Sequence, residues 1–238
     1  MKAFLDFLAS PAGIAVYCIV AVAIVVFFFS VNYRFFAKRA LDVIFGALLA
    51  AVTSPVLGVC AAVCRYRAGR VFDYIVIAGR DGEPVKARVF CAGGGLGKRI
   101  SRLPLLLSVV TGGLSFIGPA LLTYTESVLV PEEYSARFGV RPGLLAAASE
   151  SFDSQPEYPE LFAADCRYPE RYSLWRDVRT LFLRLFRALR GEGWRLEPGG
   201  YIASLQTSGK LNEEELVEAE QLSREEQLEY RRRKMRVG

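Results

Sequence analysis

The stretch VIFGALLAAVTSPVLGVCAAVC, from Val43 to Cys64, decides how this chain is built, because it is uncharged and apolar enough to enter a membrane. Basic residues flank it on both sides: Lys38 and Arg39 before it, and Arg65, Arg67 and Arg70 after it. Since lysine and arginine favour the cytosolic face of a membrane, both ends of the segment are expected on that face.

Ser54 and Pro55 stand in the middle of this segment. A proline removes the backbone hydrogen bond to the carbonyl of Ala51 and bends the helix, and the hydroxyl of Thr53 or Ser54 can satisfy the freed carbonyl. Residues 36–67 are therefore expected to form a re-entrant membrane helix that enters and leaves on one face. The alternative is a kinked spanning helix, which would place everything after it on the other side.

A second apolar stretch, GIAVYCIVAVAIVVFFFS, runs from Gly13 to Ser30. Residues 1–35 are expected to hold one N-terminal transmembrane helix rather than a signal peptide, because no small-residue cleavage motif follows Ser30 and the next residues are bulky and basic. Lys2 is the only basic residue before the stretch, whereas Arg34, Lys38 and Arg39 follow it, so the N-terminus is expected outside and the rest of the chain in the cytosol.

The composition also favours a membrane protein. The chain of 238 residues is 52% hydrophobic with a mean hydropathy of +0.25 and a net charge of +5. With these apolar segments, the positive charge indicates an anionic lipid surface rather than nucleic acid as partner. The chain has no histidine, and its five cysteines lack the paired spacing of a zinc site or a disulfide framework. No metal ligand is therefore predicted.

The remaining chain divides into a cytosolic domain, residues 68–192, and a tail, residues 193–238. Residues Arg70–Phe90 hold two β-rich runs around a Gly-Arg-Asp-Gly turn, which predicts a β-hairpin. A buried helix is expected over Leu103–Val110 and a short extended piece over Leu114–Gly118. The expected fold class is α+β, mostly helical with a small hairpin.

Two charged helices are expected near the end of the chain. Residues Ser173–Arg190 place leucine and valine on one side and arginine largely elsewhere, which is typical of a helix in a membrane interface or of one packed on a core. The tail from Leu211 is acidic early and basic late, and its apolar stripe is thin. It is expected to form a solvated helix or one that binds a partner weakly.

Several short motifs occur in a fixed order: KRALDVIFG (38–46), SP (54–55), LSFIGP (114–119), VRPG (140–143) and DCRYPERYSLWRDVRTL (165–181). In this order they resemble the bacterial sugar transferases, small monotopic polyprenyl-phosphate phosphoglycosyl transferases that start exopolysaccharide, O-antigen and related glycan assembly. The resemblance implies that family's fold, with its re-entrant Ser-Pro helix, and a place on the bacterial cytoplasmic membrane.

The resemblance also implies a reaction, in which a sugar-1-phosphate passes from a UDP-sugar to undecaprenyl phosphate. In the family, the Asp-Glu pair of a Leu-Asp-Glu-Leu-Pro-Gln motif carries the chemistry together with Mg²⁺. Here that motif aligns with residues 100–105, so Ser101 and Arg102 occupy the dyad positions. A serine with no base nearby in sequence is a poor nucleophile, and an arginine cannot bind magnesium. No catalytic residue and no cofactor are therefore predicted, although Mg²⁺ would be expected if the chain were active.

Other motifs of the family have also changed. Ala120 replaces the arginine of Gly-Pro-Arg-Pro, Leu145 replaces the threonine after Arg-Pro-Gly, and residues 88–91 no longer read Lys-Phe-Arg-Thr. Some basic residues remain as candidate contacts for phosphate or lipid: Lys38, Arg39, Lys98, Arg99, Arg102, Arg137 and Arg141. The motif residues expected to be structural are Gly118, Pro119, Pro142, Gly143, Asp165, Tyr168 and Asp177.

Three functions are compatible with this pattern. The favoured one is an inactive pseudoenzyme that serves as partner or scaffold, beside an active transferase or a polysaccharide-assembly protein. The second is an active phosphoglycosyl transferase with a diverged site, for which the candidate carboxylates are Asp165, Asp177, Glu126 and Asp73. The third is a lipid-binding or anchor protein unrelated to glycans.

Overall fold

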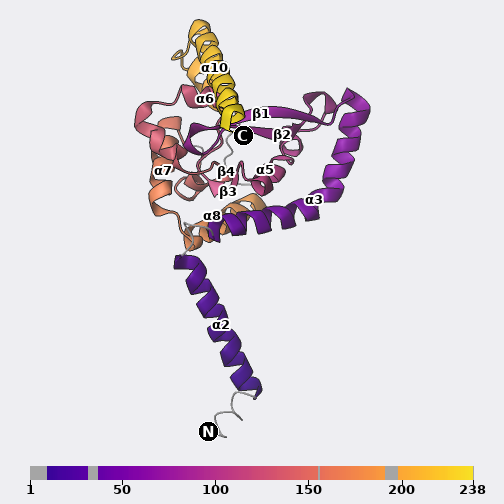
Figure 1. Cartoon of the computed structure of the whole chain (residues 1–238), viewed down its shortest axis with the longest axis vertical. Coiled ribbons are helices and arrows are strands. Elements are labelled where there is room, and N and C mark those ends of the chain that lie inside the picture. The colour runs from indigo at the N-terminus through magenta and orange to yellow at the C-terminus, as the bar shows by residue number, and fades with distance from the viewer. Residues whose placement is uncertain (1–9, 32–36, 155, 191–197, 238) are drawn as a thin grey trace.

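The computed structural model describes residues 10–31, 37–154, 156–190 and 198–237. Its fold is α+β, as predicted: mostly helical, with two small two-stranded sheets at the centre of the globular part (Figure 1). Helix α2 (Pro11–Val31) projects away from this globular part (Figure 1). In the described ranges one helix, α3 (Lys38–Ala68), is long and apolar enough to cross a membrane, and α2 holds a shorter apolar segment, Ile14–Phe27.

Helix α3 bends in its middle (Figure 1), where Pro55 interrupts the backbone hydrogen bonds. The hydroxyl of Ser54 donates to the carbonyl oxygen of Ala51 at 2.7 Å. This contact confirms the prediction that a nearby hydroxyl donates to the carbonyl left without its backbone partner by Pro55. The outer face of the helix is apolar and exposed over Ile44, Phe45, Leu48, Val52, Val56 and Val59.

The predicted hairpin consists of β1 (Phe72–Ala78) and β2 (Pro84–Phe90), which pair antiparallel. The short 3₁₀ helix η2 (Arg80–Gly82) makes the turn, with Asp81 in the left-handed region at φ 56°. An aspartate tolerates this conformation better than most residues, because its short side chain can bond locally.

The segment after the hairpin forms η3 (Ala92–Gly94), α4 (Lys98–Ser101) and α5 (Leu105–Thr111). Leu105 and Val109 of α5 are buried in a core cluster with residues of both hairpin strands, which confirms the predicted buried helix. The predicted extended piece is β3 (Ser115–Gly118). It pairs in parallel with β4 (Gly143–Ala146), a pairing that the sequence did not indicate.

Short helices and turns follow β3: α6 (Tyr124–Val128), η4 (Glu132–Gly139) and η5 (Ala147–Glu150). Longer helices complete the chain: α7 (Tyr158–Arg171), α8 (Leu174–Leu189), α9 (Gly200–Thr207) and α10 (Glu213–Val237). Helix α10 contacts α6 and lies on the opposite side of the globular part from α8 (Figure 1). The tail is therefore helical, as predicted, and it packs on the domain through buried Ala219 and Ser223.

Candidate functional site

The dyad position lies in a tight backbone segment between two helices. Ser101 is the last residue of α4, Arg102 follows it, and both are partly buried. The backbone N–H of Ser101 donates to the carbonyl of Gly97 at 3.0 Å, and that of Leu105 donates to the carbonyl of Arg102 at 3.0 Å. Leu103 packs on a buried cluster that includes Cys60 and Cys64 of α3, so this segment is fixed against the second half of α3.

The side chains at this position do not fit a magnesium ion. No aspartate or glutamate occurs between Pro84 and Thr125, and the whole chain has no histidine. Within the described ranges, no group of three His, Cys, Asp or Glu side chains could hold a metal ion. An arginine beside a neutral serine offers one hydroxyl oxygen and a positive charge, whereas Mg²⁺ requires carboxylate or phosphate oxygens.

Lys98 and Arg99, two of the predicted phosphate or lipid contacts, begin α4. Their side chains lie outside the described residues. The glycine-rich loop before them packs closely on α3, because a Cβ at Gly94 would lie 3.5 Å from the Cα of Cys64. This loop therefore leads from the end of β2, along the second half of α3, to the dyad position.

A small basic pocket of about 150 Å³ lies at the other end of α5. Four cationic side chains line it, against one carboxylate, that of Asp42; the cations are Lys38, Arg39, Arg80 and Arg141. Three of these four were predicted as phosphate or lipid contacts. The seven residues of α5 separate this pocket from Arg102 by about 10 Å along the helix axis.

Lys38 and Arg39 attach α3 to the globular part. The Nζ of Lys38 lies 2.5 Å from the Oδ2 of Asp177 and donates at 3.0 Å both to the hydroxyl of Tyr168 and to the carbonyl of Ile117. The guanidinium of Arg39 donates to the carbonyl oxygens of Val109 and Val110, near the end of α5, at 2.7 and 2.8 Å. A cation at a helix C-terminus is stabilised by the helix dipole.

Asp42 completes this attachment. Its carboxylate accepts hydrogen bonds from the hydroxyl of Ser115 at 2.6 Å and from the backbone N–H of Phe116 at 3.0 Å. The first turn of α3 is thereby joined to β3, and the sequence KRALD acts as one anchoring unit.

Replacing Lys38 with methionine is expected to lower the free energy of unfolding by about 3 kcal/mol, because the buried carboxylate of Asp177 would lose its cation. Thermal unfolding of the purified protein in detergent measures the change. The control is Lys86→Met on the exposed side of β2, for which a change within about 0.5 kcal/mol is expected. Equal stabilities of the two variants would contradict the anchoring role of Lys38.

Arg137 and Asp165 form a separate, fully buried ion pair. The Nη2 of Arg137 lies 2.8 Å from the Oδ2 of Asp165 and 2.8 Å from the carbonyl oxygen of Ala120. The backbone N–H of Ala120 donates to the same carboxylate oxygen at 2.9 Å. Burial raises the pKa of Asp165 to about 6, although the Arg137 guanidinium opposes this rise. Arg137 is 2% exposed, so its guanidinium contacts the protein interior.

The candidate carboxylates for a diverged enzyme have distinct surroundings. Asp165 and Asp177 form the ion pairs described above, and buried Glu126 accepts backbone hydrogen bonds from Thr123 at 2.8 Å and Tyr201 at 2.7 Å. Asp73 is nearer the surface, where it pairs with the guanidinium of Arg70 at 3.0 Å. It also accepts a bond from the backbone N–H of Ala92, in the loop that leads to the dyad position, at 3.3 Å. Asp73 is therefore the one of these four carboxylates that lies at this loop.

The predicted structural motifs meet around β3 and β4. Gly118 and Pro119 end one motif, Pro142 and Gly143 end the other, and the backbone N–H of Gly143 donates to the carbonyl of Pro119 at 2.9 Å. Tyr168 reaches the same place, since its hydroxyl lies 2.7 Å from Asp177. The sequence reasoning did not single out Arg80, Asp42, Ser115 or Tyr172, which also line the basic pocket. Asp42, Ser115 and Tyr172 all lie within the quoted motifs, and this placement was the available signal.

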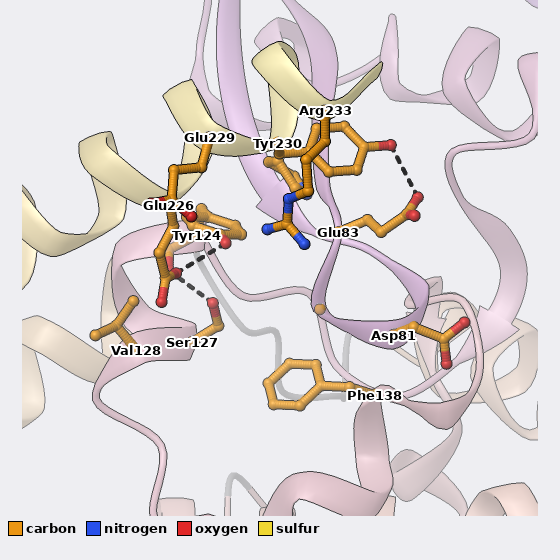
Figure 2. Close-up of a pocket in the computed structure, with 12 residues that line it drawn as sticks. Asp81, Glu83, Tyr124, Ser127, Val128, Phe138, Glu226, Glu229, Tyr230 and Arg233 are labelled. Atoms are coloured by element: carbon orange, nitrogen blue, oxygen red, sulfur yellow. Dashed lines mark hydrogen bonds between the residues drawn. The ribbon is translucent and has the colours of Figure 1, made fainter. Parts of the chain in front are cut away.

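A cavity of about 1070 Å³ forms an acidic groove between the hairpin turn, α6 and α10 (Figure 2). The carboxylates of Asp81, Glu83, Glu226 and Glu229 line it, and Arg233 points into it. The hydroxyl of Tyr124 donates to Glu226 at 2.9 Å, and that of Tyr230 donates to Glu83 at 3.0 Å. Burial and Glu226 raise the pKa of Tyr124. Because this groove is acidic, the basic pocket suits an anionic phosphate better.

The sequence resembles known proteins over this region. The family described as "Bacterial sugar transferase" matches residues 86–191. A UDP-glucose:undecaprenyl-phosphate glucose-1-phosphate transferase of Caulobacter vibrioides is 31% identical over 178 residues, covering 60% of this chain and 66% of that protein. A protein of the same name from Escherichia coli K12 is 26% identical over 183 residues, covering 63% of this chain and 39% of that protein. The chain belongs to the bacterial sugar transferase family.

A third relative is the uncharacterized sugar transferase EpsL of Bacillus subtilis 168, which is 31% identical over 94 residues, covering 40% of this chain and 46% of that protein. The chain thus spans about two fifths to two thirds of the length of these curated relatives. The family match includes Ser101, Arg102, β3, β4 and α8 of this chain, and it begins after α3.

Proposed function

We propose that this protein is a catalytically inactive member of the bacterial sugar transferase family, bound to the bacterial cytoplasmic membrane. Its role is that of a partner or scaffold in exopolysaccharide or lipopolysaccharide glycan assembly, beside an active transferase or a polysaccharide-assembly protein. One observation carries the proposal: Ser101 and Arg102 occupy the dyad position, in a segment of chain without any carboxylate from Pro84 to Thr125.

The proposed membrane placement rests on how α3 is held. Its first turn contacts Asp177 and β3, and its second half packs on Phe90 and Cys91 at the end of β2. Both ends therefore meet the same globular part, which supports a re-entrant helix better than a spanning one. Helix α2 would then supply the transmembrane helix, with the N-terminus outside and residues 68–192 and the tail, residues 193–238, in the cytosol.

The proposed ligands follow from the relatives and from the basic pocket. Two relatives are named for UDP-glucose and undecaprenyl phosphate, both of which carry phosphate. Arg80 and Arg141 line the pocket beside the anchoring cations and offer planar guanidinium groups suited to phosphate oxygens. The chain would therefore retain binding of polyprenyl phosphate or a UDP-sugar without turning it over.

An active transferase with a diverged site is the second candidate, and the position of Asp73 favours it. This carboxylate lies beside the loop that leads to Ser101, and a carboxylate can act as a phosphoryl acceptor. Such an enzyme would lack the second acid of the family's pair.

Release of nucleoside monophosphate tests both candidates. The purified full chain is placed in nanodiscs with undecaprenyl phosphate, Mg²⁺ and a panel of UDP-sugars, beside the double variant Ser101→Asp/Arg102→Glu. No release above the protein-free background is expected from the unmodified chain. Release by the double variant alone would show that the substrate site is intact and lacks only its acids, and silence from both would direct the search to protein partners.

Release by the unmodified chain would overturn the proposal. The variant Asp73→Asn would then show whether this carboxylate carries the reaction, since loss of release in that variant is the result expected of the diverged enzyme. Lys86→Asn, on the exposed side of the same hairpin, serves as its matched control.

A further inference from the structure

A second basic cleft, away from the dyad position and from the basic pocket, lies between α7 and α8. It measures about 700 Å³. Four arginines line it against two glutamates, so its net charge is positive; the arginines are Arg167 and Arg171 from α7 and Arg176 and Arg179 from α8. No residue of this cleft lines the basic pocket near α3.

The arginines of the two helices differ in their pairing. The carboxylate of Glu150 forms ion pairs with both arginines of α8: its Oε2 lies 3.2 Å from the Nε of Arg176, and its Oε1 lies 3.1 Å from the Nη1 of Arg179. The two arginines of α7 are exposed, and among the residues that the structure describes no carboxylate lies within ion-pair distance of Arg167 or Arg171. Their guanidinium groups are therefore available to an anion at this edge of the cleft.

Helix α8 has an apolar face that no part of the described protein covers. Exposed fractions are 68% for Trp175, 65% for Phe182 and 79% for Leu189, whereas Asp177 and Thr180 on the opposite side are buried. Helix α8 also contacts α2 and lies where α2 leaves the globular part (Figure 1). A helix with this distribution lies in a membrane interface, with its apolar side chains among the lipid chains.

The arginine cleft lies on the flank of this apolar face. At 100° per residue, Arg176 and Arg179 project between the outward face and the buried face of α8. When the apolar side chains reach the lipid chains, guanidinium groups on this flank lie at the depth of the phosphates. Phosphate oxygens suit the planar donors of arginine.

We propose that this cleft binds the phosphate of an anionic phospholipid headgroup on the cytosolic face, through Arg167 and Arg171 together with the two arginines of α8. The proposal rests on the membrane placement under the proposed function, but not on the loss of catalysis. Bound headgroups would fix the rotation of α8 about its own axis and hold the globular part at a defined depth.

Thermal unfolding of the full chain in a neutral detergent tests the site. The added probes are dioctanoyl phosphatidylglycerol, dioctanoyl phosphatidylcholine and inorganic phosphate at matched concentrations. Phosphatidylglycerol is expected to raise the Tm of the unmodified chain, because a ligand that binds the folded state stabilises it. In the double variant Arg167→Gln/Arg171→Gln, the phosphatidylglycerol concentration that gives half of the maximal rise in Tm is expected to increase at least about tenfold.

The control is Arg224→Gln/Arg232→Gln, which removes the same charge from exposed positions on α10, far from α8. It is expected to respond to phosphatidylglycerol as the unmodified chain does. An unchanged response in Arg167→Gln/Arg171→Gln would overturn the proposal. An equal response to inorganic phosphate or to phosphatidylcholine would overturn the assignment to an anionic headgroup.

A separate measurement distinguishes this site from the membrane placement on which it rests. All three proteins are reconstituted into phosphatidylcholine vesicles and washed with alkaline carbonate, and each is expected to stay in the membrane through α2 and α3. Retention without a specific phosphatidylglycerol response would overturn the lipid site alone, whereas loss of all three proteins in the wash would overturn the membrane placement.

Discussion

The variant Gly143→Ala is expected to lose its folded state, with a fall of more than about 3 kcal/mol in the free energy of unfolding. A Cβ at this position would lie 2.7 Å from the Cα of Gly118 and 2.5 Å from the carbonyl oxygen of Leu145. Both neighbours are backbone atoms of the paired strands β3 and β4, so no side-chain rotation can relieve the overlap. Far-UV circular dichroism and thermal unfolding in detergent measure the loss.

Gly139→Ala is the matched control for this prediction. A Cβ there would meet nothing within 4 Å, although Gly139 is only four residues away. Its stability is expected to stay within about 0.5 kcal/mol of that of the unmodified chain. A Gly143→Ala protein as stable as this control would show that β3 and β4 do not approach as closely as the structure has them.

The second large effect is expected from Arg137→Met, which should lower the free energy of unfolding by about 3 to 5 kcal/mol. The substitution would leave the carboxylate of Asp165, which is 0% exposed, without its cation. The double variant Arg137→Met/Asp165→Leu removes both charges, and it is expected to recover much of the loss. A double variant no more stable than Arg137→Met would show that the pair does not act through charge.

The pH dependence gives an independent check on Arg137→Met. Burial raises the pKa of Asp165 to about 6 even beside Arg137, and the pKa is expected to be higher still without that cation. The unfolded chain has an aspartate pKa of about 4, so the folded state binds the extra proton between these values. The stability difference between variant and unmodified chain should therefore shrink as the pH falls towards about 6, where the carboxyl becomes neutral in both.

The sequence predicted those parts of the fold that depend on neighbouring residues. The hairpin follows from β-rich runs around a turn, and the contact of Ser54 with the Ala51 carbonyl follows from the presence of Pro55. The amphipathic pattern predicted a helix over residues 173–190, and α8 occupies Leu174–Leu189. In each case the signal lies within one element.

The contacts between distant segments were not predictable in the same way. Strands β3 and β4 pair in parallel although the whole of η4 lies between them, and a four-residue strand carries no signal for its partner. Lys38 shows the same limit at the site. Its charge indicated a phosphate or lipid contact, whereas the structure places its Nζ beside Asp177, a residue that the family motif marked only as structural.

The tail shows a further limit. Its thin apolar stripe predicted a solvated helix or a weak partner-binding helix. In the structure, polar contacts hold α10 on the domain beside the packing of Ala219, since Tyr124 donates to Glu226 and Tyr230 donates to Glu83. The tyrosines and glutamates that make these hydrogen bonds follow no regular spacing in the sequence, so a search for hydrophobic periodicity does not detect them.

The anchoring of α3 has a consequence for how the protein is made. Lys38 precedes its partner Asp177 by 139 residues, and Asp42 precedes Ser115 by 73. At ordinary rates of translation, the ribosome needs on the order of ten seconds to add the residues between Lys38 and Asp177. The apolar helix α3 therefore leaves the ribosome before the groups that anchor its first turn exist. The first turn of α3 is anchored only after Asp177 has been synthesised, so the docking of this helix on the globular part waits for residues far along the chain.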